Sequence, residues 1–102
     1  GDIPHSVENL LKIAAIRALA HRAYVTEVVI NRQEVRLTMY QKARLRVEKI
    51  PDLVRSYKGD LKLVPGDVPS FHYIDRRNKN QDSLEMMGKA EEILKDIYGI
   101  RI

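Results

Sequence analysis

The sequence contains no cysteine, so it can form neither a disulfide framework nor a thiolate metal site. It also lacks an apolar run of the roughly 20 residues that a membrane-spanning helix needs. The first five residues carry neither the basic nor the apolar region of a signal peptide. These absences argue against a disulfide-stapled, membrane-spanning or exported protein, and we expect a cytoplasmic one with no membrane partner.

Motifs for catalysis and for cofactor binding are missing as well. His5, His21 and His72 are widely separated, and no HxH or HExxH spacing completes a metal shell. The glycines form neither GxxxxGK[ST] nor GxGxxG, so no nucleotide site is visible. No nucleophile stands beside an orienting acid-base group. We therefore expect a chain without catalytic residues, metal or cofactor, whose histidines are separate packing or surface residues.

What the sequence does contain is the composition of one folded domain. Of its 102 residues, 44% are hydrophobic and 31% are charged, which indicates a single core spanning residues 1–102. Eighteen basic residues against fourteen acidic ones give a net charge of +4. This small excess permits weak contact with nucleic acid or an acidic protein surface.

Residues 4–23 predict a long helix with an unusually wide apolar surface, and Pro4 suits its first turn. Ile13, Ile16 and Ala20 widen the main stripe, so we expect partners on more than one side, either in a deep core or beyond this chain. Substituting Leu11 by Ala should then cost about 2 to 5 kcal/mol. The predicted core stripe consists of Val7, Leu10, Leu11, Ala14, Ala18 and His21.

The remaining pattern predicts two hairpins and two further helices. β-branched and alternating apolar residues mark the strands, and glycines or Asx residues mark the turns. Ile50 precedes a proline, which disfavours helical geometry, so we expect the second helix to start at Pro51. The predicted segments are strands 25–30 and 34–40, helix 51–59, strands 61–64 and 71–74, and helix 83–98.

The fold class that follows is α+β: helix, hairpin, helix, hairpin, helix, with antiparallel hairpins packed with three helices. In the first hairpin, Arg36 and Thr38 should face solvent. In the last helix, Asp82 and Glu85 make a plausible capping pair. Its predicted buried face consists of Leu84, Met87, Ala90, Leu94 and Ile97, while Met86 lies on a second apolar strip with Ala90 and Ile93.

Two basic stretches are the candidates for nucleic-acid contact. Lysine and arginine can bind phosphates without sequence preference, but stacking aromatics are sparse, since only Tyr40 adjoins the first stretch and Tyr73 the second. Solvated loops are the alternative explanation for the charge. The candidate residues are Lys42, Arg44, Arg46 and Lys49 in the first stretch, and Arg76, Arg77 and Lys79 in the second.

The first helix resembles the C-terminal domain of bacterial transcription-repair coupling factors. The family's pattern runs from a proline through Leu-Leu-x-Ile-Ala-x-Leu/Ile-Arg to an alanine, and looser similarity continues through both hairpins to the last helix. One departure is Tyr24, where the family commonly has a helix-closing glycine, so we expect a differently built turn there. The matching residues of the first helix are Pro4, Val7, Leu10, Leu11, Ile13, Ala14, Ile16, Arg17 and Ala20.

The resemblance implies a non-catalytic part of a larger protein that works in nucleotide excision repair. In that family, the whole protein is a cytoplasmic ATP-dependent DNA translocase that releases stalled RNA polymerase and recruits UvrA. Its ATP site lies in helicase-like domains outside this chain. The C-terminal domain packs against a UvrB-like module of the same polypeptide and acts as an autoinhibitory clamp. Part of the family's contact region precedes the proline, so we expect this chain to hold only part of the clamp and assign no contact residue. The alternatives are a small nucleic-acid-binding module and, with least support, a small enzyme.

Overall fold

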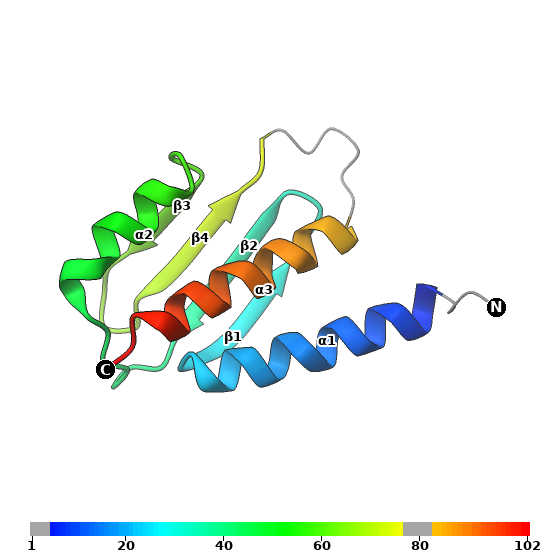
Figure 1. Cartoon of the computed structure of the whole chain (residues 1–102), viewed down its shortest axis with the longest axis horizontal. Coiled ribbons are helices and arrows are strands. Elements are labelled where there is room, and N and C mark those ends of the chain that lie inside the picture. Colours follow the sequence, from blue (N-terminus) through cyan, green and yellow to red (C-terminus); the bar gives the residue numbers. More distant parts are fainter. Residues whose placement is uncertain (1–4, 77–82) are drawn as a thin grey trace.

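Residues 5–76 and 83–102, the part of the chain that the computed structural model describes, form three α-helices and four β-strands (Figure 1). The predicted α+β class is confirmed. The boundaries lie close to the predicted ones, and a short 3-10 turn at Val47–Lys49 precedes the second helix. In chain order the elements are α1 (His5–Arg22), β1 (Val25–Ile30), β2 (Glu34–Met39), α2 (Ile50–Ser56), β3 (Leu61–Val64), β4 (Ser70–Ile74) and α3 (Ser83–Gly99).

The two hairpins join into one antiparallel sheet with the strand order β1-β2-β4-β3. β2 pairs with β4 in a register that places Leu37 opposite Phe71. The turn between β1 and β2 is built on Asn31, whose side-chain oxygen accepts the backbone N–H groups of Gln33 at 3.0 Å and Glu34 at 2.8 Å. This local arrangement ends β1 and reverses the chain into β2.

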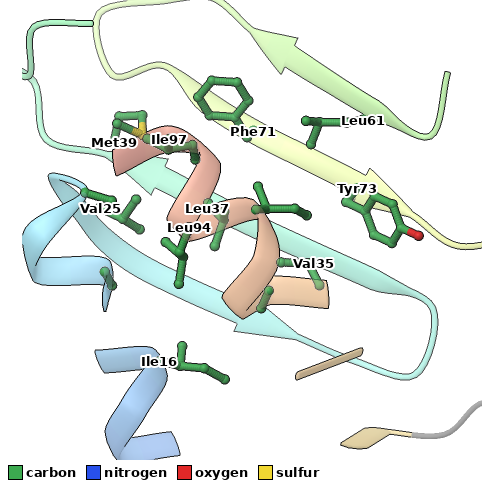
Figure 2. Close-up of a cluster of buried hydrophobic side chains, with 14 of the residues drawn as sticks. Ile16, Val25, Val35, Leu37, Met39, Leu61, Phe71, Tyr73, Leu94 and Ile97 are labelled. Carbon is green, nitrogen blue, oxygen red and sulfur yellow. The ribbon is translucent and has the colours of Figure 1, made fainter. Parts of the chain in front are cut away.

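One face of the sheet carries the core, as the alternation in β2 predicts. Val35, Leu37 and Met39 are buried, whereas Arg36 is exposed as predicted and Thr38 is half-buried. Figure 2 shows buried side chains of the sheet, among them Leu37 and Phe71, clustered with Leu94 and Ile97 of α3. α1 packs against α3 and β1, and α2 lies beside β3. The helices thus gather on the core face of the sheet.

The predicted core stripe of α1 is wrong. In the structure, Ile16 and Ala20 face the core, with Ala23 just beyond the helix, and Ile13 and Leu19 are half-buried. The helix is therefore rotated by about half a turn from the predicted orientation. Because apolar residues occur nearly all round α1, periodicity alone does not select the packed side. The residues left exposed are Val7, Leu10, Leu11, Ala14, Ala18 and His21.

The predicted buried face of α3 needs a smaller correction. Met86 is fully buried, whereas Met87 is half-buried and packs at the edge of the core. Ala90, Leu94 and Ile97 are buried as predicted, and Ile93 is buried with them. In the first turns of α3, Met86 therefore takes the core position that was predicted for Met87. Leu84 is half-buried, and Asp82 of the predicted capping pair lies outside the described residues.

Two turns differ from expectation. Ile50 has helical geometry, with φ −61° and ψ −46°, because the preceding 3-10 turn already places its N–H on the carbonyl of Val47. The helix therefore begins at Ile50 instead of at Pro51. Tyr24 adopts the left-handed conformation with φ +60°, so the turn after α1 keeps the geometry of a glycine cap and is not built differently.

No helix within the described ranges 5–76 and 83–102 is both long and apolar enough to cross a membrane. α1 is long enough in residues, but it is interrupted by charged side chains such as Glu8, Lys12 and Arg17.

Candidate interaction surfaces

The most distinctive surface is the exposed side of α1, which we call the apolar α1 face: Val7, Leu10, Leu11, Ala14 and Ala18. Its large side chains are 43%, 65% and 60% exposed at Val7, Leu10 and Leu11. Helical spacing of three and four residues brings them onto one side. Single exposed apolar residues are ordinary on a protein, but a contiguous set on one helix indicates a contact site.

A groove adjoins this face between α1 and the edge strand β1. Its cavity volume is about 760 Å³, and Arg17 and His21 stand where it meets the apolar α1 face. Because β1 is an edge strand, the sheet provides no further strand to close the groove on this side. Its apolar lining comes from Ile13, Ile16, Ala20, Val25, Val28, Ile30 and Met87.

The basic residues predicted from the sequence are not brought together into one site. Lys42, Arg44 and Arg46 are exposed in the segment between β2 and α2, and Lys49 lies in a shallow hollow shared with Asp52 and Asp96. Arg76 is exposed beyond the far end of β4, in a hollow with Lys62 and His72. Arg77 and Lys79 lie outside the described residues.

A second basic element, missed by the sequence analysis, lies at the chain's C-terminal end. The guanidinium of Arg101 stands 4.3 Å from the ring centroid of Tyr98 and 5.2 Å from that of Tyr24, and it donates a hydrogen bond to the carbonyl of Arg22 at 2.7 Å. Arg22 and Arg101 are 79 positions apart, so no local sequence signal predicts their contact.

His21 and His72 lie on different elements and do not converge. His21 is exposed beside the groove, whereas His72 lies half-buried on β4 with Nε2 2.9 Å from the hydroxyl oxygen of Ser70. His5 belongs to the first turn of α1. Within residues 5–76 and 83–102, no group of three or more His, Asp or Glu side chains is arranged to hold a metal ion.

Among the described residues, one buried phenol has a structural role. The hydroxyl of Tyr57, just after α2, donates a hydrogen bond of 2.5 Å to Asp96 of α3, and its ring meets that of Tyr73 edge-on at 5.9 Å. Burial, followed by the hydrogen bond to Asp96, raises the pKa of Tyr57 far above its usual value. The phenol therefore stays protonated and joins α2 to α3 and the sheet.

Comparison with known families is informative for the half of the chain that contains the apolar α1 face. The family model described as TRCF domain matches residues 1–50. Residues 1–50 are therefore similar to the TRCF domain. This TRCF match includes α1, β1, β2 and the basic segment with Arg44 and Arg46, and it supports the resemblance to the C-terminal domain of transcription-repair coupling factors. The TRCF domain is a non-catalytic domain of that family. No curated protein and no solved structure matches the chain.

Proposed function

We propose that this chain is an autoinhibitory interaction domain of a cytoplasmic transcription-repair coupling factor, and that its apolar α1 face docks on the UvrB-like module of the same polypeptide. The observation that carries the proposal is the exposure of Val7, Leu10 and Leu11 on the helix that the TRCF match includes. As the resemblance implies, the whole protein would use ATP elsewhere, act on DNA and RNA polymerase, and recruit UvrA once the clamp opens.

The apolar α1 face is large enough to support an intramolecular contact. Fully burying a leucine side chain contributes about 1.5 to 3 kcal/mol. Leu10 and Leu11 each keep roughly three fifths of their surface exposed, so covering both would contribute about 2 to 4 kcal/mol, with Val7 adding to it. The adjoining groove would extend this area toward β1.

Tethering makes such a modest contact sufficient for inhibition. Two modules on one polypeptide meet at an effective concentration of about 1 mM. A Kd of about 10 μM between the separate modules would then keep roughly 99% of the protein closed. The contact inhibits only if it favours the closed state over the open one, so weakening it should release the protein's activity.

The direct test is binding between this chain and the separately purified UvrB-like module, measured by calorimetry or anisotropy. Leu11→Lys keeps a good helix former but places a charge on the apolar α1 face, and it should weaken binding at least tenfold. Val47→Lys is the matched control, since Val47 is also apolar and is at least as exposed as Leu11 but lies outside α1.

In the full-length protein, Leu11→Lys should raise basal ATP hydrolysis, whereas Val47→Lys should not. The proposal fails if the chain and the module do not associate at tens of micromolar. It also fails if Leu11→Lys and Val47→Lys bind the module equally well while both remain folded by circular dichroism.

A further inference from the structure

One end of the molecule collects basic and aromatic side chains from three separated segments. We call it the basic pole, and it lies where α1 ends, where the chain leaves β2 and where the chain terminates (Figure 1). Backbone hydrogen bonds hold these segments together: Arg46 N–H donates to the carbonyl of Ile100 at 2.7 Å, and Ile102 N–H to that of Arg44 at 2.9 Å. The basic pole consists of Arg22, Lys42, Arg44, Arg46 and Arg101 with Tyr24, Tyr40 and Tyr98.

Within residues 5–76 and 83–102, the cations of the basic pole form no ion pair with an acidic side chain. Elsewhere the structure pairs Lys12 with Glu91, Arg55 with Asp52 and Lys89 with Glu92. Among the described residues, no ion pair joins any of the five basic side chains of the pole to a carboxylate side chain. Several positive charges on neighbouring segments, without ion pairs among the described residues, raise the local potential and favour an anionic partner.

The tyrosines provide flat surfaces beside these charges. Tyr40 is 47% exposed and Tyr98 45% exposed, and Tyr40 N–H donates to the carbonyl of Tyr24 at 2.6 Å, which fixes the two tyrosine backbones side by side. Arg101 is anchored against Tyr98 and Tyr24, so its guanidinium is ordered before any ligand arrives. Ordering of this kind lowers the entropic cost of binding.

We propose that the basic pole binds single-stranded nucleic acid, with phosphates on its arginines and lysine and bases stacked on Tyr40 or Tyr98. Phosphate-binding cations interleaved with exposed aromatic rings are the combination that single-strand binders use. An acidic protein segment would use the charges but gain little from the rings. The proposal goes beyond the docking function, because Arg22 lies eleven residues along α1 from Leu11, a rise of roughly 16 Å.

Fluorescence anisotropy with a labelled 20-nucleotide oligo(dT) tests the proposal at 50 mM and 200 mM salt. We expect a micromolar Kd at 50 mM salt that rises steeply with salt, with a log–log slope near −2 for about three neutralised phosphates. Arg44→Glu with Arg46→Glu should weaken binding more than tenfold. Lys62→Glu with Arg76→Glu makes the same charge change at exposed positions away from the pole, and it is the matched control.

The aromatic contribution is tested separately. Tyr98→Ala, which keeps every charge, should weaken oligo(dT) binding about 5- to 100-fold, and Tyr98→Phe should retain most of it. Circular dichroism of each variant separates loss of binding from loss of folding. If Tyr98→Ala does not fold, Tyr40→Ala gives the same readout, because Tyr40 and Tyr98 are exposed to a similar extent.

Three results would overturn the proposal. The first is no binding of oligo(dT) below about 100 μM at low salt, and the second is equal weakening by the pole variant and the matched control. The third is equally tight binding of poly-glutamate or duplex DNA with no effect of Tyr98→Ala, which would make the pole an acidic-protein or duplex site. Leu11→Lys should leave oligo(dT) binding unchanged, so this proposal and the docking proposal fail independently.

Discussion

Replacing Leu11 by alanine tests the orientation of α1 through protein stability. Leu11 is 60% exposed, so roughly two fifths of its surface is removed from water in the folded chain. With about 1.5 to 3 kcal/mol for complete burial, the lost contribution is about 0.6 to 1.2 kcal/mol. The slightly better helix propensity of alanine offsets a few tenths. The expected cost is therefore below about 1 kcal/mol, in place of the 2 to 5 kcal/mol that a core position would give.

Leu94→Ala is the reference, because Leu94 of α3 is 0% exposed. This substitution should lower the free energy of unfolding by about 2 to 5 kcal/mol. Both free energies of unfolding come from urea titrations followed by circular dichroism, with the slope m checked for constancy. A cost above about 2 kcal/mol for Leu11→Ala would show that α1 packs its other side on the core. Such a result would also remove the exposed surface on which the proposed docking depends.

Other predictions concern single interactions of the fold. Tyr57→Phe removes the hydrogen bond to Asp96 and should lower the unfolding free energy by about 0.5 to 1.5 kcal/mol in urea titrations at pH 7. The pKa of Tyr57 is raised in the folded state, so the contribution of this phenol to the unfolding free energy is complete below the unfolded-state pKa near 10 and is lost as the pH rises further. The unfolding free energy of wild type should therefore fall more steeply than that of Tyr57→Phe between about pH 10 and 11.5. Equal slopes would contradict the burial of this phenol. Gly88→Ala, inside α3 with open space for the new Cβ, should raise the free energy of unfolding by about 0.5 to 1 kcal/mol in the same urea titrations. Gly59→Ala should lower it by about 1 kcal/mol, because Gly59 has a φ of +89°.

Much of the fold could be predicted from local pattern. The β2 alternation assigns Val35, Leu37 and Met39 to the core because a strand turns successive side chains to opposite faces, and the structure agrees. The pairing of β2 with β4 could not be predicted, since it joins residues such as Leu37 and Phe71 that are far apart in sequence. Only packing in three dimensions selects that register.

The candidate sites also contain residues that the sequence predicts and residues that it does not. The sequence identifies Arg44 and Arg46 as candidate surface cations, because they alternate with the apolar Ala43 and Leu45, and the structure packs those two against the core while both arginines are exposed. It gives no hint that Arg22 and Arg101 lie beside them, because chain reversal through the whole sheet brings those segments together. In the sequence, few aromatic residues adjoin the first basic stretch. The same long-range contacts bring Tyr24 and Tyr98 to this end of the molecule, where both rings contact Arg101.

The error in the predicted core side of α1 and the proposed docking function have the same physical basis. Three-and-four spacing of Val7, Leu11 and Ala14 indicates a surface shaped to be buried, but it does not say in which molecule. The same helix also buries Ile16 and Ala20 on its opposite side in this domain, so its apolar residues serve two contacts. A helix with apolar residues on two sides needs cover on both. The periodicity therefore describes the docked state that we propose for the whole protein, while the structure shows the side that the domain packs by itself.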